Sequence, residues 1–347
     1  MVSLENVTIL ILTHERQDYL ERALEYYTGY SLKIVVADSS SMPFKMIPNY
    51  SSVEYLHFQG KTHGQKLSEV LTLIGTRYTV MCADDDFTIP DAIETCIEFL
   101  EKNTTYAVAQ GNSVSYKKET EYPGGPVLNV MYPGQYSFVI NQDTPFDRIA
   151  GLFHNYRTIF CAVHHTQYLR LAYGGINDRF TNLFLNEYLS AIIPLIAGKH
   201  IELPVFFQVR EYTHISGDKT TDNLDVIYTE GRYSTELNNY LEYTADIISH
   251  MITMDKETCK QALNDILSVF AEKLAAQKSM YVSVTFLKRA GKIISHVPFI
   301  GKKIILYHRS ISRKKQVSGI LRTKQDIVNL HVINRLILKY AARLSGI

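Results

Sequence analysis

Three consecutive aspartates, Asp84, Asp85 and Asp86, are the residues of this sequence best suited to chemistry. They follow an apolar run with β-branched and aromatic residues, 78–82 (YTVMC), which predicts a short strand buried on both faces of a sheet. Carboxylate oxygens are the ligands that hard divalent cations prefer, and such cations also hold phosphate oxygens. The pattern favours a metal and phosphate site. The alternative is a solvated acidic turn that caps the helix starting near Pro90.

Two earlier segments also end in polar residues where a predicted strand ends. Residues 7–12 (VTILIL) form one apolar run, which is followed by Thr13 and Arg16 and then by a segment with helical periodicity. Residues 32–37 (LKIVVA) form the next run, which stops at Asp38. Ligand crevices in open α/β sheets lie outside the carboxyl ends of the strands. We therefore expect these strand ends and the aspartates to share one edge of the sheet.

Taken in order, these segments resemble glycosyltransferase family 2, whose members have the nucleotide-binding GT-A fold. The resemblance rests on VTILILTHERQDYLERAL, IVVADSS and YTVMCADDDFTIPDAI, and it covers roughly residues 5–215. It implies an α/β fold with a Rossmann-like, mixed sheet flanked by helices. It also implies a metal-dependent, inverting transfer of a sugar from a nucleoside diphosphate sugar, with Mn²⁺ or Mg²⁺ as cofactor. Uridine is the commonest donor nucleotide in that family.

The resemblance implies a role for each residue on the donor side. Arg16 is expected to contact the base and the diphosphate, and Asp38 to hydrogen-bond the base. Asp86 is expected to ligate the metal, Asp84 to hold the ribose or a metal-bound water, and Asp85 to face the donor sugar. Ordinary alternatives remain open, because arginine is common in solvated turns and Asp-Ser-Ser is common in loops.

Three further residues are assigned to the donor site. Thr13 ends the first strand, and Lys66, beside a helix predicted at residues 67–74, is expected to neutralise phosphate charge; the alternative is a solvated lysine. His214 follows a closing strand predicted at residues 205–211. Family members often place a histidine there to complete the metal site or touch the diphosphate, and neutral imidazole suits Mn²⁺. A surface loop histidine is the alternative.

Glu187 is the candidate catalytic base. The segments GGIND (174–178) and NEYL (186–189) resemble the Gly-Gly motif and downstream acidic pair of the family. In that register Glu187 falls where the family carries its base, usually an aspartate. Direct displacement at an anomeric carbon needs a carboxylate that takes the proton of the acceptor hydroxyl. Asp178 is the reserve candidate, and a glutamate on a helix surface is the alternative.

Charge divides the chain unevenly. Residues 286–347 contain 14 Lys and Arg against one acidic residue, which leaves 22 basic and 34 acidic residues in the remainder. We predict a transferase domain over residues 1–230 and a helical region over residues 231–347, with amphipathic helices at 257–278 and 326–344. Such a basic extension favours contact with an anionic membrane surface. Packing on the core or in a homo-oligomer is the alternative.

The four cysteines, Cys82, Cys96, Cys161 and Cys259, lie far apart and have no paired spacing for zinc or a disulfide framework. We therefore expect reduced thiols. No signal peptide is recognisable, and no uninterrupted apolar run reaches the roughly 20 residues that span a bilayer. The expected location is the cytoplasm or the inner face of the cytoplasmic membrane. A bacterial surface polysaccharide or lipid-linked glycan is the expected acceptor.

Two other functions compete with this prediction. A sugar nucleotidyltransferase would also need a nucleotide-binding α/β domain and carboxylates for metal, but no glycine-rich phosphate loop follows the first strand. A nucleic-acid-binding protein would use the basic extension as its footprint. That extension has few aromatic residues for stacking on bases, so no nucleic-acid partner is expected.

Overall fold

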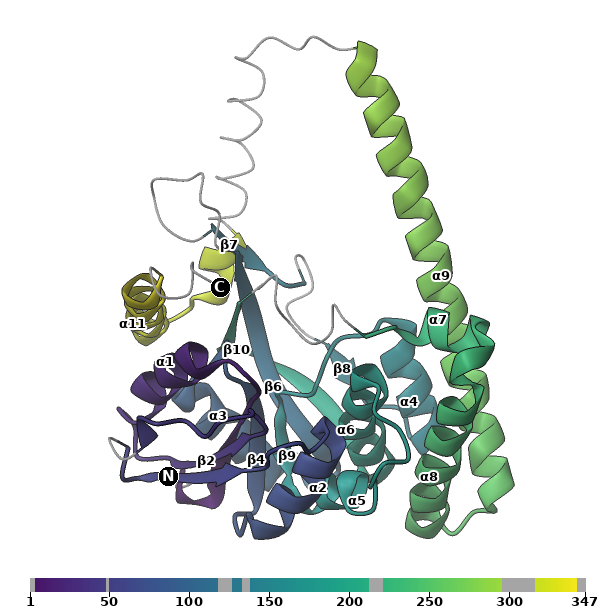
Figure 1. Ribbon diagram of the computed structural model, residues 1–347, viewed down its shortest axis with the longest axis horizontal. Coiled ribbons are helices and arrows are strands. Elements are labelled where there is room, and N and C mark those ends of the chain that lie inside the picture. The colour runs from purple at the N-terminus through teal and green to yellow at the C-terminus, as the bar shows by residue number, and fades with distance from the viewer. Residues whose placement is uncertain are drawn as a thin grey trace.

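The structure, a computed structural model, describes residues 4–47, 50–117, 127–132, 138–211, 221–294 and 316–341. The strands are β1 Val7–Thr13, β2 Lys33–Asp38, β3 Val53–His57, β4 Tyr78–Ala83, β5 Phe87–Thr88, β6 Tyr106–Lys117, β7 Val127–Val130, β8 Val139–Ile140, β9 Val163–His165 and β10 Lys199–Glu211. They form one mixed sheet in the order β3-β2-β1-β4-β9-β6-β10-β5, with β7 beside β6 and β8 beside β10 (Figure 1).

β1 lies between β2 and β4 and runs parallel to both. Its register pairs Thr13 with Asp38 on one side and Leu12 with Ala83 on the other. Asp84 follows Ala83 directly, so the polar ends of the three strands meet at one edge. The prediction of a shared edge is confirmed.

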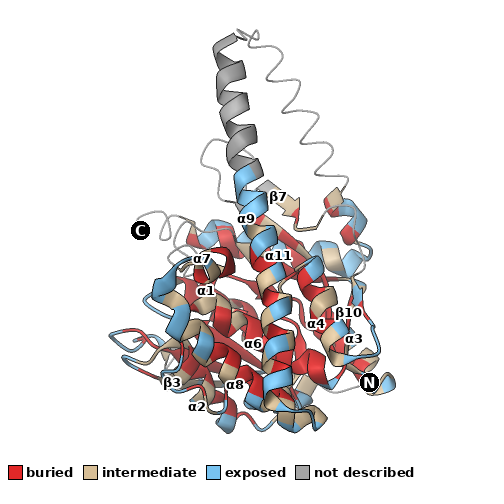
Figure 2. Ribbon diagram, turned by 90° about the vertical axis from the view of Figure 1, so that its right-hand side faces the viewer, coloured by how far each residue is buried: buried red, intermediate tan, exposed pale blue. Residues whose placement is uncertain are grey.

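Helices cover both faces of the sheet. They are α1 Gln17–Tyr27, α2 His63–Leu73, α3 Pro90–Lys102, α4 Pro145–His154, α5 Thr166–Tyr173, α6 Leu183–Ala197, α7 Leu224–Thr229, α8 Ser234–Ile252, α9 Lys256–Ile294 and α11 Lys324–Tyr340. Alternate residues of β1 enter different cores, as the period of a strand requires: Ile9 and Ile11 pack with α1, α3 and α11, and Leu10 packs with α2, α4, α5, α6, α8 and α9. Figure 2 shows the buried sheet between these layers. The predicted α/β fold with a mixed sheet flanked by helices is confirmed.

Two local predictions differ from the structure. The helix predicted to start at residue 67 starts at His63, because Thr62 and Gln65 form a capping box. The sequence of residues 106–113 predicts a strand that ends at Ala109 and a turn at residues 111–113, but this turn is wrong, since β6 continues to Lys117. Gly111 lies inside β6 where β10 comes close: a Cβ there would lie 2.6 Å from the carbonyl oxygen of Val205. The close approach, rather than a turn, explains this glycine.

The C-terminal helices share the two cores of the sheet. α8 and α9 pack with α4, α5 and α6, whereas α11 buries Leu330, Ile333 and Ile337 in the core beside α1. Lys339 of α11 forms an ion pair with Glu25 of α1, at 2.6 Å. The predicted amphipathic helices are confirmed, and the division at residue 230 stays a prediction. No helix in the described ranges combines the length and apolarity that crossing a membrane would take.

Candidate functional site

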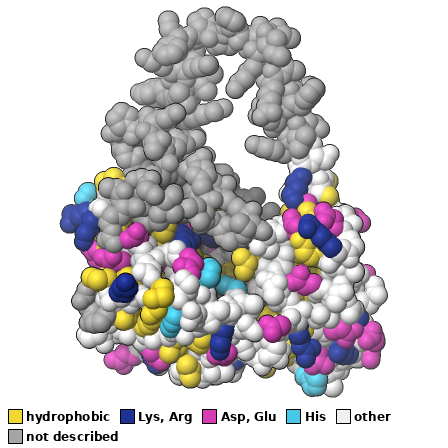
Figure 3. Space-filling view, in the orientation of Figure 1, with side chains coloured by type: hydrophobic (Ala, Val, Ile, Leu, Met, Phe, Trp, Pro, Cys, Tyr) yellow, Lys and Arg dark blue, Asp and Glu magenta, His cyan; other side chains and the backbone are white. Residues whose placement is uncertain are grey.

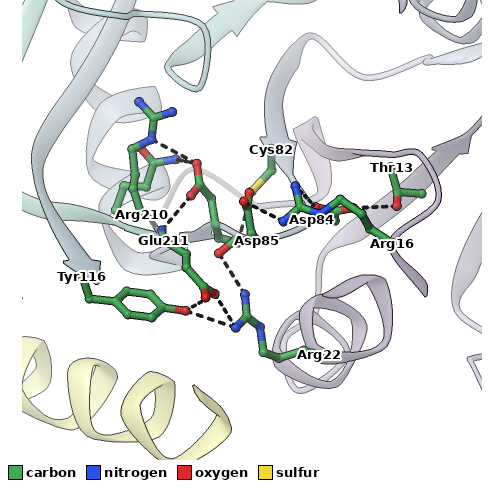
Figure 4. A network of polar contacts seen from close by, with 11 residues as sticks. Thr13, Arg16, Arg22, Cys82, Asp84, Asp85, Tyr116, Arg210 and Glu211 are labelled. Atoms are coloured by element: carbon green, nitrogen blue, oxygen red, sulfur yellow. Dashed lines mark hydrogen bonds and ion pairs between the residues drawn. The ribbon is translucent and has the colours of Figure 1, made fainter. Parts of the chain in front are cut away.

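Asp84, Asp85 and Asp86, called here the aspartate turn, link β4 to β5 and are buried (Figure 4). Thr13 at the end of β1 donates a hydrogen bond of 2.6 Å to Asp84 Oδ2. Arg16, just before α1, approaches Asp84 Oδ1 at 3.2 Å and Asp85 Oδ2 at 2.7 Å. The structure therefore brings four of the predicted donor-site residues, Thr13, Arg16, Asp84 and Asp85, into one contact network. A solvated acidic turn, the alternative interpretation, is wrong because the aspartates are 2–6% exposed.

Asp86 is held from the opposite side by the end of β10. Arg210 Nε donates to its Oδ2 at 3.1 Å, and Gln208 Nε2 lies 3.4 Å from the same oxygen. The backbone N–H of Glu211 donates to Oδ1 at 3.2 Å. The antiparallel pairing of β5 with β10 sets this geometry, because it places Gln208 opposite Thr88. Asp86 thus joins the donor-side residues to the far half of the sheet.

Burial changes the acidity of this turn. It raises the pKa of Asp84 to about 7 although the positive charge of Arg16 opposes the shift. It raises the pKa of Asp86 to about 7 against the opposing charge of Arg210. Removing a carboxylate from water disfavours its charged form. The turn therefore favours a ligand or partner that supplies further positive charge.

Arg22 is a residue of the network that the sequence did not identify. Its side chain is 0% exposed, and it donates to Glu211 Oε2 at 2.6 Å, to Asp85 O at 3.0 Å and to Tyr116 Oη at 3.1 Å (Figure 4). Tyr116 Oη also donates to Glu211 Oε2. The signal was present: Arg22 stands three residues after Tyr19 and four before Tyr26, on the apolar side of α1. A charged residue at such a position indicates a buried partner.

Lys66 and Asp38 lie at the neighbouring strand ends. Lys66, in the first turn of α2, is 2% exposed, and its Nζ donates to Thr13 O at 2.8 Å and to Ser39 Oγ at 3.1 Å. Burial lowers its pKa to about 8, although Asp84 and Asp38 oppose the shift. The solvated-lysine alternative is wrong. Asp38 is fully buried and accepts hydrogen bonds from Ser40 N and Tyr55 Oη, the loop chemistry left open as its alternative.

Glu187 lies in the first turns of α6 and is partly buried. Tyr156 Oη donates to its Oε1 at 2.6 Å. The negative charge of Glu187 affects two residues of the far half of the site. Burial raises the pKa of Cys161 to about 12, and Glu187 adds to that shift. Glu187 also helps to raise the pKa of Arg210. Glu187 is therefore a neighbour of the arginine that holds Asp86.

Asp178, the reserve candidate, has different surroundings. It is exposed, and Gln65 at the start of α2 donates to its Oδ1 at 2.7 Å. Within the described residues it makes no hydrogen bond or ion pair with the aspartate turn. Beside Arg210, a narrow polar cleft is lined by Gln110, Ser113, Tyr132, Glu202, Gln208 and Arg210, among others. Its position makes Glu187 the better placed of the two carboxylates.

The charges around the turn bear on metal binding. Six carboxylates take part, namely Asp38, Asp84, Asp85, Asp86, Glu187 and Glu211, against four cationic side chains, Arg16, Arg22, Lys66 and Arg210. The all-oxygen donor set fits a divalent cation such as Mg²⁺ or Mn²⁺, whose charge would favour the ionised forms of Asp84 and Asp86 that burial disfavours. In the described part of the chain, however, no three His, Cys, Asp or Glu side chains form a ready ligand group. His214 lies outside the described residues.

Comparison with known proteins finds a family match for part of this chain. Residues 8–165 match the family model for glycosyl transferase family 2. No curated protein matches the chain. A crystal structure of S. aureus TarS is similar at 12% identity with a TM-score of 0.47, covering 76% of this chain and 43% of that chain. S. aureus TarS 1-349 in complex with UDP-GlcNAc gives 11% identity and a TM-score of 0.48, covering 76% of this chain and 71% of that chain.

Proposed function

We propose that the chain is a glycosyltransferase of the family 2 type, whose family model matches residues 8–165, and that it moves a sugar from a nucleoside diphosphate sugar to a hydroxyl group of a glycan. The observation that carries the proposal is the single strand edge at which Arg16, Lys66 and Arg210 surround the aspartate turn. Cations suit a diphosphate, and carboxylates suit a ribose or a metal. Uridine is the proposed nucleotide because it is the commonest in the family that the sequence resembles.

We propose Mn²⁺ or Mg²⁺ as the cofactor, with Asp86 and Asp84 as the protein ligands and His214 as a further candidate. The support is the all-oxygen donor set described above, with two buried carboxyl groups whose charged forms a bound cation would stabilise. A bound divalent ion would stabilise the negative charge that develops on the departing diphosphate. Arg16 and Arg210, which contact the same carboxylates, supply positive charge to the same region.

In the proposed reaction Glu187 acts as the base. The acceptor oxygen forms a bond to the anomeric carbon while the bond from that carbon to the diphosphate oxygen breaks, so the configuration at carbon inverts. The acceptor proton passes to Glu187, and the electron pair of the broken bond leaves with the diphosphate. Tyr156 holds the Glu187 carboxylate by its hydrogen bond of 2.6 Å. The cleft lined by Gln208 and Arg210, which both contact Asp86, is the proposed approach for the acceptor.

The acceptor class is proposed from the sequence. A surface polysaccharide or lipid-linked glycan agrees with the family resemblance and with a basic C-terminal region that suits a membrane surface. A glycosyltransferase acting on such acceptors needs an open cleft rather than an enclosed pocket, since its substrate is a chain. Met131 and Tyr132 border that cleft, and they belong to a segment rich in glycine and proline, residues 122–134, which is typical of a binding loop.

Turnover of a donor panel tests the proposal. Purified protein with Mn²⁺ is incubated with UDP-glucose, UDP-galactose and UDP-N-acetylglucosamine, and released UDP is measured against a Glu187→Gln control. Slow release from one donor, accelerated by a glycan acceptor, is the expected result. Release of pyrophosphate from a nucleoside triphosphate and a sugar 1-phosphate would instead identify the competing nucleotidyltransferase.

The acidity of Lys66 gives a pH dependence of nucleotide binding. We expect the dissociation constant of UDP to rise as pH increases through about 8, because Lys66 loses the charge that attracts the diphosphate. At pH 7 a Lys66→Met variant should bind UDP about tenfold more weakly, the effect of one nearby charge. Calorimetric titration between pH 7 and 9.5 measures both proteins. The same pH profile in the variant would show that another group causes it.

A further inference from the structure

α11 has two faces with different surroundings. At about 100° per residue, its buried side chains fall on one side of the helix and dock against α1 and the sheet. Its opposite side exposes Ile327, Val328, Val332 and Leu338, at 37–59%. Eleven large apolar side chains are exposed in the described part of the chain, and these four lie on this one helix. The concentration marks an interaction surface rather than scattered surface residues.

Cationic side chains share the exposed face with these apolar residues. Lys324, Arg335 and Lys339 are exposed there, with His331 beside them. Asp326, an acidic residue of α11, is used in the capping box with Thr323. Lys339 keeps 59% of its side chain exposed while it contacts Glu25. Figure 3 shows hydrophobic, cationic and histidine side chains gathered at the edge where α11 lies in Figure 1.

We infer that this outward face of α11, defined by Lys324, Ile327, Val328, Arg335 and Leu338, binds an anionic lipid surface. Apolar side chains placed between cations can enter the headgroup region while the cations contact lipid phosphates. The other face of α11 is not available for a lipid, because it is buried beside α1.

A lipid surface explains the face better than the other partners do. Single-stranded RNA or DNA would favour exposed aromatic residues for stacking, and Tyr340, the one Phe, Trp or Tyr of α11, is 2% exposed. A second copy of the chain would bring the same cations together, because a two-fold contact pairs a face with itself. Anionic lipid complements both the charge and the exposed apolar groups. The inference is independent of the proposed sugar transfer.

Flotation with vesicles tests the inference on the full chain. Vesicles of neutral phosphatidylcholine are compared with vesicles that contain 30% phosphatidylglycerol. We expect the wild type to float with the anionic vesicles only, and added salt to weaken the association. Lys324→Glu with Arg335→Glu should lower the partition coefficient by about 30-fold or more, given the usual contribution of each cation near such a surface. Ile327→Ser with Leu338→Ser should also lower it.

Matched controls separate the face from general charge and exposure. Lys102→Glu with Arg179→Glu changes the charge equally elsewhere, and Val269→Ser removes an apolar side chain that is 66% exposed on α9. These controls should float like the wild type, and all variants should keep the wild-type thermal midpoint. Equal flotation of the α11 variants and the wild type would overturn the inference. A second outcome would also overturn it: neither the wild type nor the α11 variants bind vesicles, while the wild type binds RNA or self-associates and the α11 variants do not.

Discussion

Replacing Glu187 by glutamine is expected to reduce the turnover rate by about 10²- to 10⁴-fold, the usual contribution of a general base. The amide cannot take the proton of the acceptor, but it keeps the size of the side chain and can still accept the hydrogen bond of Tyr156. The dissociation constant of the donor should stay within about twofold of the wild type, because Glu187 lies outside the contacts that hold the aspartate turn. Steady-state UDP release and calorimetric donor binding measure the two quantities.

Asp178→Asn is the matched control for that variant. It removes one carboxylate from the reserve candidate, which is exposed and bonded to Gln65. We expect near-normal turnover, since Asp178 makes no described contact with the site. Normal turnover of Glu187→Gln together with loss of turnover in Asp178→Asn would move the base to Asp178. Loss of donor binding by Glu187→Gln would contradict the role of a base and indicate a binding residue.

Arg22→Met is expected to lower the free energy of unfolding by about 3–5 kcal/mol, the usual cost of removing one partner from a buried ion pair. The variant leaves Glu211 with a carboxylate that is 6% exposed and no guanidinium beside it. It also removes the donor to the carbonyl oxygen of Asp85. Unfolding in urea, followed by circular dichroism at pH 7.5, measures the change.

Two further variants show whether the charge causes the loss. Tyr116→Phe removes two hydrogen bonds from the same network, one from Arg22 and one to Glu211, and should cost about 2 kcal/mol. Arg22→Met combined with Glu211→Leu removes both charges and should recover much of the stability that the single change loses. A double variant as unstable as Arg22→Met alone would show that the shape of the arginine, rather than its charge, holds the turn.

The strand edge could be predicted because apolar runs fix where strands end. Three runs of that kind place Thr13, Asp38 and Asp84 in register, and parallel pairing then brings them together. Local signals of this sort need no knowledge of distant contacts. The same reasoning found Arg16 and Lys66, since each lies within a few residues of a strand end or a helix start.

Contacts across the sheet could not be predicted in the same way. Arg22 meets Glu211 across 189 positions of the sequence, and Gln208 meets Asp86 across 122. Such pairs depend on the order of the strands and on the register shifts of β10 beside β6, which no local pattern reveals. Gly111 was misread for this reason, because the neighbour that requires it lies on another strand.

The C-terminal region shows a different limit. Helical periodicity correctly predicted α11 but could not say which partner covers its apolar side. The residues of α1 that receive it, including Glu25, lie 314 positions away from Lys339. Helical periodicity predicts that one face of a helix will be buried, whereas only the fold shows which element buries it.

A thermal-shift measurement tests the central claim, a nucleotide diphosphate site at the aspartate turn. Wild type, Asp86→Asn and the control Asp143→Asn, whose side chain is 97% exposed, are each heated with UDP, with Mn²⁺, and with both. A ligand that binds only the folded state raises the midpoint. We predict that UDP with Mn²⁺ raises the midpoint of the wild type and the control more than UDP alone, and that Asp86→Asn loses this difference. No shift of the wild type with UDP, with or without Mn²⁺, would contradict the account.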